Sequence, residues 1–195
     1  NNIHPNVSAN MDYASVKGGC VSCSTTQGAR LAGVTPSGNM PHALNLLIGD
    51  TVKAIEAFDR HLPQEVPRLA LVDTFRDEIE EAINVASSLK QRLRGIRLDA
   101  QMENQRITPA LVNEVRARLD LAGFNHVEIM VSGNITAKQI HEFSLAEAPV
   151  DSFGVGAPIA TAPPNPFTTE IHEVDGKPVA RRGSLPGISN NTRLG

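Results

Sequence analysis

Apolar and polar positions repeat as one unit along the middle of the chain: an apolar run, a polar or glycine-containing turn, and an amphipathic stretch. The apolar runs lie at 68–73, 95–99, 127–132 and 150–154, and the amphipathic stretches after the first three lie at 76–92, 109–121 and 137–146. Short apolar runs predict buried strands, and amphipathic stretches with a period of 3.6 predict helices. Strands that alternate with helices indicate parallel β/α units, so the sequence predicts an α/β fold.

The number of units leaves two folds open. Four such units, or five, fall short of the eight strands of a closed barrel, which typically needs about 250 residues. The chain has 195 residues. The pattern therefore fits an open, doubly wound sheet as well as a partial barrel that sequence from elsewhere completes.

Other patterns flank the repeated units. Upstream, 25–32 predicts a short helix ended by a glycine, and 41–61 predicts one long helix with Pro41 in its first turn. Downstream, a proline-rich link at 163–166 precedes residues that alternate around Asp175-Gly176, which indicates a β-hairpin, before a small, polar tail expected to be frayed. We therefore expect a (β/α) portion over 1–162 and a region of link, hairpin and tail over 163–195.

Composition narrows the classes of function. The chain is 41% hydrophobic with a net charge of −3, which is typical of a globular protein and gives no general attraction for nucleic acid or an anionic membrane. No apolar run approaches the roughly 20 residues of a membrane span. Cys20 and Cys23 could form a redox pair or half of a zinc site, but there is no second pair of cysteines. Two reduced cysteines near a turn are the simpler interpretation, and they fit a cytoplasmic protein.

Each predicted strand ends on residues that suit a binding site. The strand ends carry two acidic residues, Asp73 and Asp99, and two glycine turns, Ser132-Gly133-Asn134 and Gly154-Val155-Gly156. Carboxylates at this position can hold Mg²⁺ or sugar hydroxyls, and glycine turns after late strands are typical of phosphate sites. Because the ends of parallel strands meet at one edge of the sheet, we expect all four to share one site.

Each of these residues also has a structural interpretation. Thr74 with Asp77 could form a capping box to which Asp73 contributes, and Asp99 could be a solvated strand end. The glycine turns could be ordinary tight turns. Their joint occurrence at one edge favours the functional interpretation.

His42 is a further candidate, because it lies in the first turn of a predicted helix. A neutral imidazole there could act as a nucleophile toward phosphorus or as a general base, and the helix N-terminus would stabilise an added phosphate. It could also be a histidine that is packed or hydrogen-bonded near a helix start, and the residues alone slightly favour this structural role. The remaining histidines have no metal-ligand spacing and are expected at the surface or in packing: His4, His61, His126, His141 and His172.

Eight short motifs in order identify a resemblance that covers nearly the whole chain. They are Ile3-His-Pro, Gly18-Gly-Cys20, Gly38-Asn-Met-Pro-His-Ala43, Leu71-Val-Asp-Thr74, Gly95-Ile-Arg-Leu-Asp99, Val131-Ser-Gly-Asn134, Phe153-Gly-Val-Gly156 and the segment Asp175–Gly187. Together they resemble nicotinate phosphoribosyltransferase, in particular its archaeal-type branch.

The resemblance implies a fold and an activity. The fold is an incomplete (β/α) barrel of the type II phosphoribosyltransferase kind with a C-terminal β-hairpin, packed on an N-terminal domain. The activity is transfer of a phosphoribosyl group from phosphoribosyl pyrophosphate to nicotinate, with Mg²⁺ and with ATP coupled through a phosphohistidine. Related acceptors, quinolinate or nicotinamide, and a non-catalytic subunit that keeps the fold are the alternatives.

The resemblance also assigns roles to the candidate residues. His42 matches the phosphorylated histidine, and Asp73 and Asp99 face the ribose, the pyrophosphate or its magnesium. Gly133, Gly154 and Gly156, with Ser132 and Asn134, hold the 5′-phosphate.

Two features depart from the family pattern. The second strand continues as Ala100-Gln101-Met102 where the family often carries Ser-Gly-Asp. The family's arginine motif, which helps to bind nicotinate, would precede His4, but the chain begins at Asn1. We therefore expect an N-terminal half of the enzyme to complete the site, within a homo-oligomer.

Overall fold

The computed structural model describes residues 3–100, 107–163 and 165–179. The chain divides into two compact units between Ala162 and Pro163. The altered segment at Gln101-Met102 lies outside the described residues.

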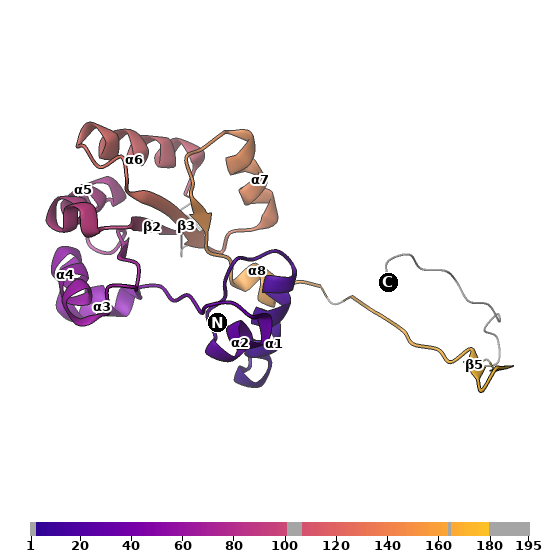
Figure 1. Ribbon diagram of the computed structural model, residues 1–195. Helices are drawn as coiled ribbons and strands as arrows, with labels where there is room; N and C mark the ends of the chain where they lie inside the picture. Colours follow the sequence, from indigo (N-terminus) through magenta and orange to yellow (C-terminus); the bar gives the residue numbers. More distant parts are fainter. Residues whose placement is uncertain (1–2, 101–106, 164, 180–195) are drawn as a thin grey trace. The chain divides into compact units, whose positions relative to one another are not determined.

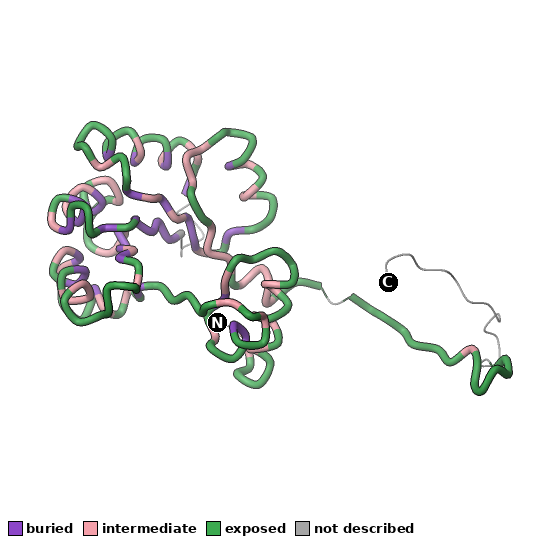
Figure 2. Tube along the Cα trace, viewed as in Figure 1, coloured by how far each residue is buried: buried purple, intermediate pink, exposed green. Residues whose placement is uncertain are grey.

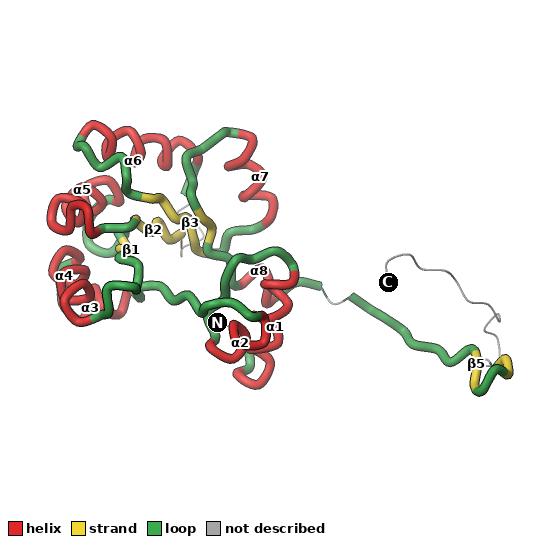
Figure 3. The backbone as a smooth tube through the Cα atoms, in the orientation of Figure 1, coloured by secondary structure: helices red, strands yellow, loops and turns green. Residues whose placement is uncertain are grey.

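A parallel sheet forms the centre of the first unit (Figures 1 and 3). Its four strands are β1 (Leu69–Leu71), β2 (Gly95–Ala100), β3 (Glu128–Gly133) and β4 (Ser152–Phe153), in the order β1-β2-β3-β4. The predicted parallel α/β fold is confirmed. In a doubly wound sheet the order reverses at a switch point, whereas barrel winding adds each strand beside the last. The observed order is that of barrel winding.

Helices connect the strands and lie around the outside of the sheet (Figure 1). They are α5 (Glu78–Leu89), continued by a 3₁₀ turn at Lys90–Arg92, α6 (Pro109–Leu121) and α7 (Ala137–Leu145). A polar side chain caps each N-terminus, as the sequence signals predict: Asp77, Thr108 and Thr136 accept hydrogen bonds from first-turn amides.

The predicted capping box at Thr74 is wrong. Asp77 is itself the N-cap of α5, and its carboxylate accepts from the amides of Ile79 and Glu80 at 3.1 and 2.9 Å. The helix consequently begins at Glu78, two residues later than predicted. Thr74 is left in the loop after β1.

The apolar core lies between the sheet and these helices (Figure 2). Side chains alternate along a strand, so Ile96 and Leu98 face the helices and are fully buried. Arg97 and Asp99 consequently point to the opposite face of the sheet. That inner face is polar near the strand ends, and it carries the site described below.

The segment before the sheet contains four helices: α1 (Pro5–Lys17), α2 (Thr26–Ala32), α3 (His42–Ile48) and α4 (Thr51–His61). The short helix ended by Gly33 is confirmed as α2. The single long helix predicted over 41–61 is wrong, because Gly49 adopts a left-handed conformation with φ +80° and ends α3. Asp50 then caps α4 by accepting from the amide of Lys53 at 2.9 Å.

The pattern of apolar residues did not predict α1. None of its residues is buried, so its sequence lacks the apolar stripe that signals an amphipathic helix. His4 caps this helix, since its Nδ1 accepts a hydrogen bond from the amide of Asn6 at 3.2 Å.

The second unit contains the predicted hairpin, which is confirmed. Strands β5 (Glu173–Val174) and β6 (Lys177–Pro178) pair antiparallel around Asp175-Gly176, whose φ angles are +50° and +75°. Positive φ at both turn residues matches the right-handed twist of the paired strands. The tail predicted from Gly183 lies outside the described residues.

Both cysteines are free thiols, Cys20 exposed and Cys23 buried. Burial raises the pKa of the Cys23 thiol, and the nearby Asp12 carboxylate and Cys20 raise it further. Cys23 is therefore a poorer nucleophile than an ordinary cysteine. In the described part of the chain, no helix combines the length and apolar character needed to cross a membrane.

A buried arginine joins α4 to the first strand. Arg68 is 5% exposed and donates from its Nε atom to Asp59 at 2.8 Å. Its other nitrogens donate to the backbone carbonyls of Asp59, Leu62, Pro63 and Val66. The planar guanidinium group thereby donates to backbone carbonyls that have no partner within the helix at the end of α4.

Arg68→Ala is expected to lower the free energy of unfolding by about 3–5 kcal/mol, because it leaves several buried acceptors without a donor. Urea unfolding measures the loss. The matched control is Arg76→Ala, which removes an exposed ion pair to Glu80 and should cost about 0.5 kcal/mol or less. Equal losses in the two variants would contradict the role given to Arg68.

Candidate active site

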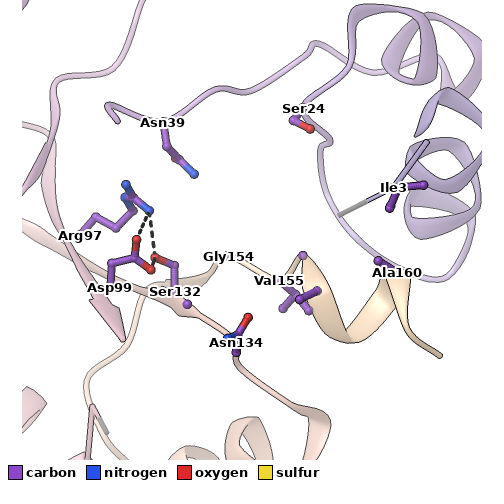
Figure 4. A pocket seen from close by; sticks show the side chains of 13 residues that line it. Ile3, Ser24, Asn39, Arg97, Asp99, Ser132, Asn134, Gly154, Val155 and Ala160 are labelled. Carbon is purple, nitrogen blue, oxygen red and sulfur yellow. Dashed lines mark hydrogen bonds and ion pairs between the residues drawn. The ribbon is translucent and has the colours of Figure 1, made fainter. Parts of the chain in front are cut away.

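A cavity of about 520 Å³ opens at the carboxyl ends of β2, β3 and β4 (Figure 4). Six of the residues predicted for the site line it: Asp99, Ser132, Gly133, Asn134, Gly154 and Gly156. Their positions follow from the register, since Asp99 of β2 pairs directly with Ser132 of β3. The structure thus brings both predicted glycine turns and one predicted carboxylate to one cavity.

A buried charged network forms the floor of this cavity. Arg97 Nη1 lies 3.0 Å from Asp99 Oδ2 and 3.1 Å from the Ser132 hydroxyl oxygen (Figure 4). The Ser132 hydroxyl lies 3.0 Å from Asp99 Oδ1, so the arginine and the serine engage both carboxylate oxygens. A buried carboxylate held in this way is fixed in direction.

In the turn after β4, Gly154 lies close to side chains of β3. A Cβ atom on Gly154 would lie 2.8 Å from Met130 Cε and 3.0 Å from Ser132 Cβ. Gly133, at the end of β3, has φ +96°, a conformation that glycine adopts without strain. Gly156 precedes the short helix α8 (Ala157–Ala160), and open space surrounds its Cα. The turns therefore leave room for a ligand beside the backbone.

His42 lies beside the two predicted carboxylates. Its Nε2 atom is 3.0 Å from Asp73 Oδ1, and its Nδ1 atom is 3.9 Å from Asp99 Oδ2. Asp73 follows β1 by two residues, so it lies in the loop beyond that strand. The histidine side chain is 26% exposed, whereas those of Asp73 and Asp99 are 10% and 4% exposed. His42 is thus a hydrogen-bonded histidine at the start of α3, placed between two carboxylates.

Burial raises the pKa of Asp73, and the neighbouring Asp99 carboxylate adds to that effect, although His42 and Arg97 act in the opposite direction. A carboxyl group with a raised pKa in the folded state binds protons that the unfolded state releases. Stability from this residue therefore falls as pH rises through the window between the unfolded and folded pKa values.

Asp73→Asn is accordingly expected to raise Tm slightly at neutral pH, because the amide is neutral and similar in shape. The gain should disappear below the ordinary pKa of a carboxyl group, about 3.9, where Asp73 itself is protonated. Thermal unfolding across this pH range provides the measurement. A destabilised Asp73→Asn protein at neutral pH would show that the ionised form is favoured instead.

The hydrogen bond at Nε2 also selects a tautomer of His42. An ionised carboxylate can only accept, so the proton of the neutral imidazole lies on Nε2 while Asp73 is charged. The lone pair then lies on Nδ1, and a carboxylate that orients the base in this way is a recurring feature of nucleophilic sites. In this structure Nδ1 lies on the side of the imidazole that faces Asp99, 3.9 Å from Asp99 Oδ2.

The described residues contain no group of three His, Cys, Asp or Glu side chains placed to bind a metal ion. Mg²⁺ in phosphate-handling sites, however, is usually held by one or two carboxylates together with substrate phosphates and water. Asp73 and Asp99 flank His42 and provide such carboxylates. The donor set fits a magnesium ion that arrives with a phosphorylated substrate.

Several residues of the site were not predicted from the sequence. Arg97 is the most important of them, and Asn39, Ser24 and Ile3 line the cavity from the N-terminal segment. Arg97 could have been predicted from the sequence, because it lies two residues before Asp99 in a predicted strand and must share the same face of the sheet. Ser24 and Asn39 lie in loops, for which the sequence pattern gives no position.

The strand order and this polar inner face define a parallel α/β domain with a polar cavity at the strand ends. Comparison with known families agrees: residues 2–168 match the family described as "Quinolinate phosphoribosyl transferase, C-terminal domain". The chain belongs to this family.

Individual relatives bear the names that the resemblance predicted. The chain is 32% identical over 146 residues to nicotinate phosphoribosyltransferase pncB2 of Mycobacterium tuberculosis, covering 74% of this chain and 30% of that protein. It is 30% identical over 178 residues to pncB1 of the same organism, covering 85% and 37%. The predicted resemblance to nicotinate phosphoribosyltransferases is confirmed.

A solved structure supports the fold over nearly the whole chain. The nicotinate-nucleotide pyrophosphorylase of Pyrococcus furiosus is 42% identical, with a TM-score of 0.86 over 95% of this chain and 47% of that one. The chain thus spans about a third of the two curated relatives and about half of the archaeal one.

Proposed function

We propose that this chain provides the phosphate- and ribose-binding part of an enzyme that makes nicotinate mononucleotide from nicotinate and phosphoribosyl pyrophosphate. The observation that carries the proposal is the meeting of a buried carboxylate network with two glycine turns at one cavity. The names of the relatives supply the substrate, since three of them refer to nicotinate or its nucleotide.

The glycine turns would hold the 5′-phosphate. Ser132, Gly133 and Asn134 follow β3, and Gly154 and Gly156 follow β4, the positions at which barrel enzymes bind phosphate. Gly154 packs so closely on β3 that its backbone can line the cavity without a side chain between it and the ligand.

The two carboxylates would act on the sugar. The nicotinate ring nitrogen attacks C1 of the ribose while the bond from C1 to pyrophosphate breaks and its electron pair leaves with the pyrophosphate. Positive charge develops on the ribose in between, and fixed negative charge nearby stabilises it. Asp99, held by Arg97 and Ser132, is already directed toward the cavity, and Asp73 lies on the other side of His42.

A magnesium ion would bind with the pyrophosphate and neutralise charge on this leaving group. Asp73 and Asp99 are the residues that would hold it. Arg97 supplies fixed positive charge at the same place without a metal.

His42 would couple ATP hydrolysis to this reaction. Nδ1 attacks the γ-phosphorus, the bond to the β-phosphate oxygen breaks, and ADP leaves with that electron pair. The Nε2 proton stays on the imidazole and donates to the Asp73 carboxylate, which stabilises the positive charge on the phosphorylated ring. Hydrolysis of the phosphohistidine by water restores the imidazole and releases phosphate.

The remaining part of the site would come from further polypeptide. The sheet has four described strands, whereas a closed barrel of this winding has eight. An N-terminal half of the enzyme would complete the barrel and provide the arginines that bind the nicotinate carboxylate, within a homo-oligomer. The incomplete barrel, the 163–195 region and the bound partners are parts of this same proposal.

The direct test is an assay of nicotinate mononucleotide formation from nicotinate, phosphoribosyl pyrophosphate and Mg²⁺, with and without ATP. The chain is assayed alone and as a fusion behind the N-terminal half of the Pyrococcus furiosus relative. We expect turnover from the fusion and little from the chain alone. Equal rates would contradict the incomplete site, and a fusion that binds phosphoribosyl pyrophosphate without turnover would leave the activity proposal unsupported.

Quinolinate is the second candidate acceptor, because the family description names it. A panel of nicotinate, quinolinate and nicotinamide with the same fusion separates these substrates. A non-catalytic subunit would use none of them, and tight binding of phosphoribosyl pyrophosphate at the cavity would count against that alternative.

A further inference from the structure

The helix that carries His42 is attached to the rest of the chain through a few side chains: Leu44 packs against the core, His42 contacts Asp73, and Asn45 is fully buried. Helix α3, all of which is described, has one buried residue, Asn45, whose exposure is 0%. The residues after it are exposed, with Leu46 at 62% and Leu47 at 86%. Leu44 packs against the core, but apolar packing does little to hold α3 at its C-terminal end, so polar contacts contribute to fixing the position of the helix.

Asn45 binds the chain on both sides of Asp73. Its side-chain amide nitrogen donates to the backbone carbonyl of Leu71 at 3.3 Å and to the hydroxyl of Thr74 at 2.7 Å. Because Asn45 is one helical turn after His42, these two bonds join the histidine helix to the segment that presents the aspartate.

The Asp73 segment is itself fixed from the opposite side. The carboxylate of Glu81, which is 1% exposed, accepts from the amides of Thr74 and Phe75 at 3.2 and 3.1 Å. The Thr51 hydroxyl donates to the same carboxylate at 2.9 Å and ties it to α4. Thr74 is thus a rigid point, and Asn45 is the group that attaches α3 to it.

The side-chain amide of Asn45 carries a cost in folding free energy. Its Oδ1 atom is buried and has no hydrogen-bond partner among the described residues. A buried polar atom without a partner costs stability. The part of this side chain that is satisfied is its amide nitrogen, which donates to Leu71 and Thr74.

We propose that Asn45 is a positioning residue that keeps His42 Nε2 within hydrogen-bonding distance of Asp73, and so keeps the reactive lone pair on Nδ1. The geometric part stands by itself, and its consequence for phosphorylation rests on the function proposed above. Without the Asn45 donor, α3 can shift relative to the loop after β1, and the imidazole can adopt either tautomer.

The experiment measures the tautomer of His42 by long-range ¹H–¹⁵N NMR at a pH where the imidazole is neutral. Wild type should carry its proton on Nε2. Asn45→Ala should give a mixture of the two tautomers, and Thr74→Val, which removes the hydroxyl acceptor but keeps the shape, should move in the same direction by less. Asn113→Ala is the matched control, because the Asn113 amide also donates to a backbone carbonyl, at 2.9 Å, on the exposed side of α6.

A second readout is the rate of ³²P transfer from ATP to His42. This rate should fall about tenfold to a hundredfold in Asn45→Ala, because displacing a reacting group by about 1 Å or less has a cost of this size. A folded Asn45→Ala with wild-type tautomer would overturn the proposal, and if that variant does not fold, an unchanged tautomer in Thr74→Val would do so. Altered tautomers in a protein that never accepts phosphate would keep the positioning role and remove the proposed coupling to ATP.

Discussion

Replacing His42 by alanine is expected to abolish transfer of ³²P from γ-labelled ATP to the protein. The reason is geometric: His42 is a partly exposed imidazole whose Nε2 is held by Asp73 at 3.0 Å, so that Nδ1, which lies 3.9 Å from Asp99 Oδ2, carries the lone pair. Ribosyl transfer itself should persist at a reduced rate, because the sugar chemistry uses Asp99 and the glycine turns rather than the imidazole. Filter-bound label with wild type and variant, in the fusion that carries the N-terminal half, measures the effect.

His141→Ala is the matched control, since His141 is an exposed histidine on α7 and should label like wild type. Asp73→Asn should reduce labelling without abolishing it, because the asparagine cannot retain the Nε2 proton as strongly. Undiminished label in His42→Ala would remove this residue as the phosphate acceptor.

The parallel fold and the shared edge of the strands could be predicted because they depend on local patterns. Each strand is a short apolar run and each crossover helix has an apolar stripe, so periodicity alone predicted that strands and helices alternate along the chain. The ends of parallel strands must meet, so Asp99, Ser132 and Gly154 could be placed together without knowing any distance. The order of the strands, which distinguishes barrel winding from a doubly wound sheet, is a long-range property that this pattern does not contain.

The elements that were missed lack such patterns. Helix α1 buries none of its residues, and the break between α3 and α4 depends on the left-handed conformation of Gly49. A glycine within an amphipathic stretch weakens the prediction of a helix, but it does not show where the helix ends. Both segments come before the sheet, where the chain has no repeated unit to guide the interpretation.

Within the site, too, residues that follow a local pattern could be predicted and residues that depend on long-range contacts could not. Arg97 shares a strand face with Asp99, so alternation could have identified it. Asn45 and Glu81 could not be identified in this way, because one is a polar residue on a short helix and the other is an acidic residue on an amphipathic one. Their importance arises from contacts between segments about 30 residues apart in sequence, Asn45 with Thr74 and Thr51 with Glu81. Burial of a polar side chain becomes visible only when the tertiary structure is known.

Asp99→Asn is expected to lower kcat/KM for phosphoribosyl transfer by about 10²–10³, the usual cost of losing one fixed charge-stabilising group at a reacting centre. Arg97 and Ser132 engage both carboxylate oxygens, so an asparagine amide would fit the space but place a donor against Arg97. The variant thus removes negative charge near the ribose and also loosens the arginine that faces the cavity. Steady-state kinetics of the fusion, with phosphoribosyl pyrophosphate and nicotinate varied separately, give the change in kcat and in each KM.

Asp120→Asn provides the comparison, because Asp120 pairs with Arg116 at 2.7 Å on α6 and is remote from the cavity. It removes a carboxylate from an arginine pair just as Asp99→Asn does, but it should leave kcat/KM unchanged. The fall in Asp99→Asn should appear mainly in kcat, since charge on the ribose develops only in the transition state. A loss confined to KM for phosphoribosyl pyrophosphate would instead assign Asp99 to ground-state binding, and wild-type kinetics would remove it from the site altogether.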